Sequence, residues 1–340
     1  MATPVQGQPA FLATHRALIE SALRAAIGGD SAAIVAASRY VMGWENERGR
    51  PASNTGKRVR PALCVFACEA FGGSPESALP GAVAVELVHN FSLVHDEVQD
   101  HDPERHHRPT LWALLGEAQA INVGDFLFTR AVEALTDATG PVERRMAALR
   151  TLNAAIGRMI AGQWEDIAFE SRETVTVDEY LAMTAGKTGA LLSAPVQIGA
   201  LLAGVPEEQA ELAGKWGLEV GLAFQAHDDF LGTWGEPGLT GKSNTNDIAR
   251  RKKTLPIVHG MQNAGAADVI RSVYARESLE NDDISAVVAA LESAGSDAYC
   301  RELARSHAER ADSMLDALAL PEETRARFRA VGAYLVERSS

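Results

Sequence analysis

The sequence is poor in aromatic residues, in cysteine and in positive charge. Aromatic residues make up 6% of the 340 residues, and the three cysteines are too few for a disulfide framework, which indicates a reducing compartment. The formal net charge of −13 argues against nucleic acid as a partner and against electrostatic attraction to anionic membranes. Cys64 and Cys68 lie one helical turn apart in an apolar run, and we interpret them as small core residues.

The sequence also lacks the pattern of a signal peptide and of a membrane span. Its N-terminus has no basic start followed by a long apolar stretch. The longest apolar segment, Gly189 to Val205, contains Pro195 and Gln197 and is shorter than the roughly 20 residues that cross a bilayer. We therefore expect this segment to be a buried core helix, and the protein to be cytoplasmic without an integral membrane segment.

Helical periodicity, in contrast, is abundant. Hydrophobic residues make up 46% of the chain, and they recur at three- and four-residue spacing almost throughout, whereas the alternation typical of strands is nearly absent. This pattern predicts an all-α protein with about a dozen helices in a single bundle-like domain, residues 1–340. Turn-forming clusters separate the helices, and none is long enough to be an inter-domain linker. They fall at residues 28–30, 47–56, 72–80, 102–109, 136–141, 170–178, 206–208, 232–246 and 294–297.

The first acidic cluster ends the apolar stretch ELVHNFSLVHDEVQD, residues 86–100. Asp96 and Asp100 share one helix face, and the remainder of the helix is apolar nearly all round. Like charges beside a core repel each other, so a positive partner is expected. Mg²⁺ suits carboxylate oxygens, and Glu97, turned about 100° away, would be a supporting group. An exposed amphipathic helix is the alternative interpretation.

Several histidines near this cluster raise zinc as a second candidate metal. However, the segment has no H-E-x-x-H spacing and no cysteine pair, which favours magnesium. The histidines concerned are His95, His101, His106 and His107.

A second acidic cluster, FQAHDDFLG at residues 224–232, precedes a glycine-rich loop and a basic segment. Gln225, Asp228 and Asp229 share a helix face. Carboxylates beside clustered cations indicate a phosphate that is bound through metal ions and directly by lysines. A basic cluster that is only a solvated face is the alternative interpretation. The cations that follow are Lys242, Arg250, Arg251, Lys252 and Lys253.

Two further basic sites fit a phosphorylated ligand. Lys57 and Arg60 stand at the start of a predicted helix, where backbone N–H groups also favour anions. Lys187 and Thr188 lie between glycines that allow another group to approach closely.

Taken in order, these segments resemble the trans-isoprenyl diphosphate synthases, the enzymes that make farnesyl and geranylgeranyl diphosphate. The resemblance implies the all-α isoprenoid synthase fold, a homodimer, and a central cavity between two facing aspartate-rich helices. It also implies condensation of an allylic diphosphate with isopentenyl diphosphate. The matching segments are GKRVRPAL, ELVHNFSLVHDEVQD, ERHHRPT, NVGDFLF, GQWEDIAFE, GKTGALL, FQAHDDFLG and NDIARRKKTLP, between residues 56 and 256.

The resemblance further assigns roles to individual residues. Asp96 and Asp100 would hold two Mg²⁺ and Asp228 a third, so that about three ions grip the allylic diphosphate. Thr188 and Gln225 would offer oxygens to the allylic cation. Direct ligands of the allylic diphosphate would be Arg105, Lys187, Lys242 and Lys252, and those of isopentenyl diphosphate would be Lys57, Arg60 and His89.

Three positions depart from the family pattern. Glu97 and Gly232 each replace an aspartate of the two acidic motifs, and we regard both changes as mild. His106 stands where the family usually has a second arginine for substrate binding, and histidine lacks the bidentate fork of arginine. We expect weaker binding of isopentenyl diphosphate, unless Arg108 compensates.

Product length is predicted from the residues before the first aspartate. Phe91 lies five residues before Asp96, about 7 Å deeper along the helix, and Ser92 beside it is small. In the family, one aromatic residue at this position with no insertion between the aspartates suggests a C20 product, geranylgeranyl diphosphate. Ordinary core packing of Phe91 is the alternative.

Two other functions remain open. A class I terpene cyclase carries N-D-x-x-S-x-x-x-E, which residues 281–289, NDDISAVVA, imitate except for Ala289. We therefore interpret Asn281–Asp283 as a helix N-cap with an acidic first turn. A weakly active partner subunit of another synthase is the second alternative. Retention of Lys57, Arg60 and His89 favours elongation.

Overall fold

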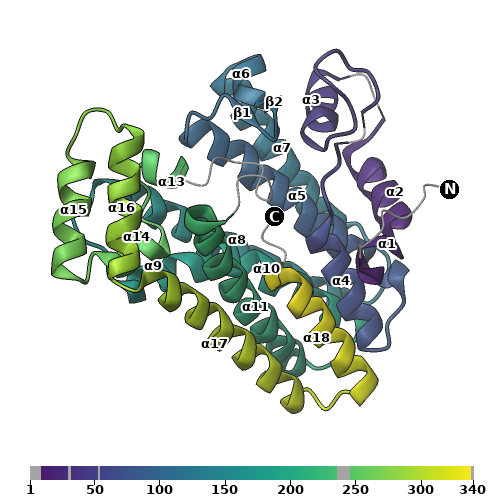
Figure 1. Ribbon diagram of the computed structural model, residues 1–340. Coiled ribbons are helices and arrows are strands. Elements are labelled where there is room, and N and C mark those ends of the chain that lie inside the picture. Colours follow the sequence, from purple (N-terminus) through teal and green to yellow (C-terminus); the bar gives the residue numbers. More distant parts are fainter. Residues whose placement is uncertain (1–8, 30–31, 53, 236–245, 338–340) are drawn as a thin grey trace. The chain divides into compact units, whose positions relative to one another are not determined.

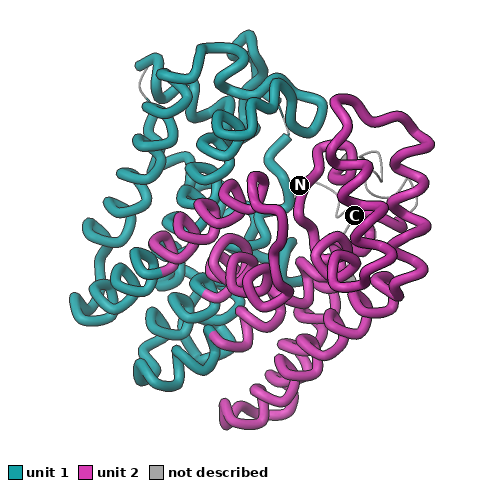
Figure 2. The backbone as a smooth tube through the Cα atoms, turned by 90° about the vertical axis from the view of Figure 1, so that its left-hand side faces the viewer, with its two compact units in different colours: residues 1–154, 194–214 teal, residues 155–193, 215–340 magenta. Residues whose placement is uncertain are grey.

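The structure, a computed structural model, describes residues 9–29, 32–52, 54–235 and 246–337, and in this part of the chain helices dominate (Figure 1). It divides into two compact units (Figure 2). Unit 1 is formed by residues 1–154 and 194–214, and unit 2 by residues 155–193 and 215–340. The all-α fold is confirmed, whereas the single domain stays a prediction.

The elements of unit 1 are α1 Ala10–Ala13, α2 Arg16–Ile27, α3 Ala33–Val41, α4 Val59–Ala70, α5 Pro75–Gln99, β1 Glu104–Arg105, β2 Arg108–Pro109, α6 Leu111–Leu115 and α7 Glu117–Thr136. Three helices contribute residues to both units, namely α8 Val142–Ser171, α10 Ala190–Ala203 and α11 Glu207–Trp234. The elements of unit 2 are α9 Val177–Thr184, the π-helix η1 Ala185–Gly189, α13 Asn246–Ala249, α14 Leu255–Gly260, α15 Ala264–Tyr274, α16 Asn281–Ser293, α17 Ser296–Ala317 and α18 Glu322–Glu337.

Helix α5 is the central helix of unit 1 and packs against α4 and α7. It begins earlier than the sequence predicts, because Ser74 accepts a hydrogen bond from the Ser77 backbone N–H and Pro75 occupies the first helical position. The predicted break over residues 72–80 is therefore too long, and Pro80 lies inside the helix. This correction adds more than one turn to the helix that carries the first acidic cluster.

Burial explains the apolar composition of α5 and α10. Among the described residues, α5 is the one helix long and apolar enough to cross a membrane, yet 72% of its 18-residue apolar window is buried inside the protein. Such burial is that of a core helix. Most of α10 is also buried, which confirms the expectation for residues 189–205. Cys64 and Cys68 are buried free thiols on α4, as predicted.

In unit 2, two glycines allow α8 and η1 to approach each other closely. A Cβ atom on Gly186 would lie 2.6 Å from the Arg158 carbonyl oxygen, and one on Gly162 would collide with the backbone of Lys187. The close approach predicted for the segment AGKTG is therefore to the backbone of α8. The π-helical turn here is a feature that recurs at functional sites, and it contains both Lys187 and Thr188.

Candidate active site

The first acidic cluster lies at the C-terminal end of α5. Asp96 and Asp100 are both partly buried, and Asp100 is the C-cap, with its backbone N–H donating to the Asp96 carbonyl oxygen at 2.8 Å. Glu97 is 9% exposed and lies 3.8 Å from the Arg105 Nε. Burial raises the pKa of Glu97 to about 7, with Arg105 opposing this rise and Asp96 adding to it. Glu97 is thus a buried carboxyl group beside Arg105, and its supporting role stays a prediction.

The carboxylates on α5 have the chemistry of a magnesium site completed by a substrate. Their donors are oxygens only, and Mg²⁺ in proteins is often held by one or two carboxylates together with substrate phosphates and water. Within the described ranges, no group of three or more His, Cys, Asp or Glu side chains is gathered for metal binding. The donor set fits a magnesium ion that needs a diphosphate to complete its coordination.

A cationic cluster lies near the start of α4 and the middle of α5. The Arg60 Nε is buried and makes no hydrogen bond to a described residue. Burial lowers the pKa of Arg60 to about 10; the charge of Glu86 opposes this shift, and Arg105 adds to it. Burial also holds the pKa of His89 well below its usual range, and Arg60, Arg105 and Arg58 lower it further. A partly buried arginine with a buried, unbonded Nε, beside a neutral imidazole that can donate a hydrogen bond, is suited to an anion.

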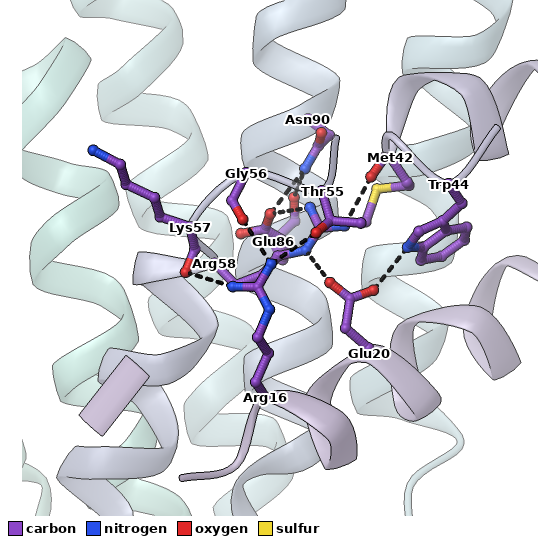
Figure 3. A network of polar contacts seen from close by, with 10 residues as sticks. All are labelled: Arg16, Glu20, Met42, Trp44, Thr55, Gly56, Lys57, Arg58, Glu86 and Asn90. Carbon is purple, nitrogen blue, oxygen red and sulfur yellow. Dashed lines mark hydrogen bonds and ion pairs between the residues drawn. The ribbon is translucent and has the colours of Figure 1, made fainter. Parts of the chain in front are cut away.

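Lys57 lies three residues before Arg60 in the sequence. Its side chain is exposed and points away from the buried network formed by the neighbouring Arg58 (Figure 3). Lys57 and Arg58 therefore have different surroundings although they are adjacent, and Lys57 is the one directed toward solvent.

His106 occupies a tight turn between the two short strands. Arg105 pairs with Arg108 across the antiparallel hairpin, and His106 and His107 have φ values of 51° and 59°. Two successive left-handed residues define the type I′ geometry that two-residue hairpins prefer. His106 is exposed at the tip, so its position is set by the turn.

Arg108 contributes to the packing of this hairpin. Its Nη2 donates to the Tyr40 and Glu45 carbonyl oxygens at 3.1 and 3.2 Å, and its guanidinium lies 4.2 Å from the centre of the Tyr40 ring. These contacts hold the hairpin against the end of α3. They do not support the compensating role that the sequence suggested for Arg108.

The two residues expected to set product length lie on the buried side of α5. Phe91 is 8% exposed and contacts the rings of His95 and Phe128, with centroid distances of 4.8 and 5.6 Å. The Ser92 hydroxyl donates to the His89 carbonyl oxygen at 2.8 Å. Phe128 on α7 is an aromatic partner of Phe91 that sequence reasoning missed.

In unit 2 a chain of hydrogen bonds joins η1 to α11. The Thr188 hydroxyl donates to the Gln225 Oε1 at 2.9 Å, and the Gln225 Nε2 donates to the Asp229 Oδ1 at 2.8 Å. The Lys187 ammonium forms an ion pair with Asp166 of α8. The structure thus brings three predicted residues, Lys187, Thr188 and Gln225, into one locally ordered cluster.

The adjacent aspartates on α11 have different environments. Asp228 is exposed, whereas Asp229 is 6% exposed and its Oδ2 accepts hydrogen bonds from the Tyr180 hydroxyl and from the Leu255 backbone N–H. Burial raises the pKa of Asp229 to about 7 despite these hydrogen bonds. Asp229 therefore orders the helix end, and Asp228 is the carboxylate that is accessible to a ligand.

Lys252 is partly buried, and its backbone N–H donates to the Asp247 carbonyl oxygen at 2.9 Å. Lys242, which the sequence also assigns to the allylic diphosphate, lies outside the described residues. The segment that imitates a cyclase motif begins α16, and the Asp283 carboxylate accepts a hydrogen bond from the Glu280 backbone N–H at 3.0 Å. The helix N-terminus is confirmed, with Glu280 rather than Asn281 as the N-cap.

The fold and the site define an all-α enzyme of the isoprenoid synthase fold. The structure of a polyprenyl synthetase from Streptomyces coelicolor A3(2) matches with a TM-score of 0.91 and 40% identity, covering 96% of this chain and 99% of that one. The sequence profile of the polyprenyl synthetase family matches residues 50–291. The chain belongs to the polyprenyl synthetase family, and it is a prenyltransferase.

Similar proteins differ in the product named for them. A (2E,6E)-farnesyl diphosphate synthase from Mycobacterium tuberculosis is 42% identical over 307 residues, which cover 88% of this chain and 85% of the relative. A geranylgeranyl diphosphate synthase from the same species is 41% identical over 259 residues, which cover 75% and 74%. The two identities are almost equal, so similarity alone does not decide product length.

Proposed function

We propose that this prenyltransferase joins an allylic diphosphate to isopentenyl diphosphate and releases geranylgeranyl diphosphate. The observation that carries the elongation step is the Arg60 guanidinium beside His89. A cyclase uses one diphosphate substrate and needs no second anion site, whereas elongation needs two. The buried Arg60 Nε has no hydrogen-bond partner among the described residues and lies beside a neutral His89, which suits a second diphosphate.

The diphosphate ligands divide between the two substrates. Isopentenyl diphosphate would be bound by Lys57, Arg60 and His89. The allylic diphosphate would be bound by Arg105, Lys187, Lys242 and Lys252, with Asp96, Asp100 and Asp228 holding about three Mg²⁺ ions. Mg²⁺, when bound there, would neutralise charge that develops on the leaving diphosphate.

The remaining chemistry needs positioning and exclusion of water rather than a side-chain base. The allylic C–O bond breaks and its electron pair leaves with the diphosphate, while the isopentenyl double bond attacks the allylic carbon. A proton then leaves the new cation, with the departed diphosphate as acceptor. Thr188 and Gln225 present oxygens that stabilise the allylic cation, and their mutual hydrogen bond fixes their orientation.

The test is incubation of the purified chain with Mg²⁺ and each allylic diphosphate, with and without isopentenyl diphosphate. Elongation predicts longer prenyl diphosphates only when both substrates are present. Hydrocarbons or alcohols from the allylic substrate alone would show cyclisation instead. Activity only after addition of another synthase subunit would show the partner-subunit role.

Phe91 supports the C20 assignment, and Phe91→Ala should lengthen the product by at least one five-carbon unit. Removing a buried phenyl ring creates space of the order of several methylene groups, into which the growing chain can extend. The control is Phe126→Ala, because Phe126 lies on α7 under the Arg130 guanidinium and not against Phe91. Mass spectrometry of the products measures the result, and an unchanged length distribution would assign Phe91 to core packing.

His106→Arg should lower KM for isopentenyl diphosphate by about tenfold, which is the effect of one added charge-assisted hydrogen bond. The turn position is the same for both side chains, so the fold should tolerate the change. His107→Arg, at the second turn position, is the matched control. Equal effects of the two variants on KM would mean that only general positive charge matters.

A second copy of this chain is the partner that the resemblance implies, and α8 offers an apolar surface in unit 2. Ile160, Trp164 and Ile167 are 52%, 74% and 41% exposed and recur at helical spacing on one face. Exposed apolar stripes of this kind favour association. The cytoplasmic location inferred from composition stays a prediction.

Trp164→Glu should shift the protein from dimer to monomer in light scattering at micromolar concentration, because a buried charge at an interface is costly. Trp112→Glu is not a suitable control, because the Trp112 indole donates to the Asp102 carbonyl oxygen. Glu165→Gln is suitable, since Glu165 is an exposed neighbour on the same helix. A dimer that survives Trp164→Glu would place the interface elsewhere.

A further inference from the structure

Helix α2 contacts the segment that precedes α4 at several points. The Arg16 Nη2 donates to the Thr55 hydroxyl oxygen at 2.7 Å and to the Gly56 carbonyl oxygen at 2.8 Å. The Arg16 Nη1 donates to the Lys57 carbonyl oxygen at 3.3 Å. One side chain from outside the segment therefore holds three consecutive residues. The contacts are drawn in Figure 3.

Arg58, the next residue, is held from the other side. It is 6% exposed and has a φ of 53°, a left-handed conformation that is strained for a residue with a Cβ atom. Its Nε donates to the Glu20 Oε1, its Nη1 to the Glu86 Oε1, and its Nη2 to the Met42 carbonyl oxygen, each at 2.8 Å. Figure 3 shows the Arg58 guanidinium between the two carboxylates.

The two carboxylates that hold Arg58 are themselves fixed. The Trp44 indole N–H donates to the Glu20 Oε2 at 2.7 Å. The Asn90 amide donates to the Glu86 Oε1 at 3.3 Å. Glu20 lies one helical turn after Arg16 on α2, so one face of α2 contacts both the backbone of the segment and, through Glu20, the buried guanidinium.

Arg58 lies between two candidate anion-binding residues, but its own contacts do not suit it to bind an anion. Lys57 and Arg60 flank it in sequence, and Arg60 lies within electrostatic reach of Glu86. Two carboxylates at 2.8 Å neutralise the Arg58 charge and would repel an approaching diphosphate. Its hydrogen-bonding edges are also directed at protein oxygens. Arg58 is therefore suited to fixing the backbone and not to binding substrate.

We infer that Arg58, Arg16 and Glu20 form a positioning device for the isopentenyl diphosphate site. The device holds residues 55–58 in a strained conformation that directs Lys57 outward and starts α4 so that Arg60 faces His89 and Arg105. Arg58 and Arg16 are positioning residues that act through Lys57 and Arg60. The inference rests on the proposed elongation activity, because it concerns the second diphosphate.

The test compares Arg58→Lys and Arg16→Met with wild type. Lysine keeps the charge that Glu20 and Glu86 require, yet it cannot reach all three acceptors of the arginine fork. Arg16→Met removes the contacts to the segment and leaves Arg58 paired with Glu20 and Glu86, so it remains informative if Arg58→Lys fails to fold. Arg48→Met is the control, because Arg48 is an exposed arginine of unit 1 outside this network.

The expected result is specific to one substrate. Arg58→Lys should raise KM for isopentenyl diphosphate by about tenfold and Arg16→Met by about threefold, with kcat and KM for the allylic substrate within about twofold of wild type. Calorimetric titration of isopentenyl diphosphate should show the same loss of affinity. Arg48→Met should leave all these values unchanged.

Three outcomes would overturn the inference. A lower melting temperature with unchanged constants for both substrates would make the network merely structural. Equal rises in KM for both substrates would indicate a general disturbance. An effect of Arg58→Lys without an effect of Arg16→Met would make Arg58 a direct ligand. If wild type does not elongate but the titration still shows the pattern above, the proposed function fails and the positioning device stands.

Discussion

Asp96→Asn is expected to lower kcat by about a thousandfold while the protein stays folded. The variant keeps the size of the side chain and removes one negative charge from the end of α5. At about 4 Å and an effective dielectric constant near 20, one pair of unit charges interacts by about 4 kcal/mol. A loss of that size in transition-state stabilisation corresponds to roughly three orders of magnitude in rate.

The measurement is steady-state turnover at saturating concentrations of both substrates, over a range of Mg²⁺ concentrations. A carboxylate that holds magnesium should also raise the Mg²⁺ concentration needed for half-maximal rate when it is neutralised. Glu76→Gln is the matched control, because Glu76 is an exposed carboxylate in the first turn of the same helix. A similar, small effect of both variants would remove the α5 carboxylates from the chemistry.

The position of Asp96 could be predicted from sequence, because it depends on local helical spacing. The spacing of Asp96 and Asp100 and the apolar residues before them are enough to place both carboxylates on one face at the end of a helix. The same periodicity predicted the buried helices α5 and α10. Local patterns of this kind need no knowledge of distant contacts. The start of α5 was less accessible, since Pro80 is typical of a break but is tolerated inside this helix.

The distinction between Asp228 and Asp229 could not be predicted in the same way. Both follow Gln225 at helical spacing, and a 100° step separates them. The choice depends on Tyr180, which is 49 residues away and donates its hydroxyl to Asp229, and on the backbone N–H of Leu255. Contacts between distant segments, rather than local spacing, make one aspartate a structural acceptor and leave the other exposed.

The same reasoning applies to the arginines of GKRVRP. The sequence assigned Lys57 and Arg60 to an anion and gave no role to Arg58. The partners of Arg58 are Glu20 and Glu86, which are 38 and 28 residues away. No local pattern identifies a salt bridge over such separations. The two arginines differ because Arg58 has carboxylate partners, whereas the buried Arg60 Nε has no hydrogen-bond partner among the described residues.

Arg60→Met is therefore expected to raise KM for isopentenyl diphosphate by about a hundredfold with little change in kcat. Loss of a charge-assisted contact to a buried diphosphate costs about 2 to 3 kcal/mol, and each 1.4 kcal/mol or so is tenfold in affinity. The pKa of Arg60 is about 10, so its guanidinium is charged at neutral pH and available for that contact. Methionine preserves most of the apolar stem, which limits any effect on packing.

The matched control is Arg48→Met, because Arg48 is an exposed arginine in the same unit that precedes residues 55–58. KM for each substrate, measured separately at saturation with the other, discriminates between the possible roles of Arg60. A rise confined to isopentenyl diphosphate supports Arg60 as its ligand. A rise confined to the allylic substrate would reverse the assignment of the two anion sites. Unchanged constants, matching those of Arg48→Met, would mean that the Arg60 guanidinium serves packing. The three results separate because a ligand that binds equally in ground and transition states changes KM alone.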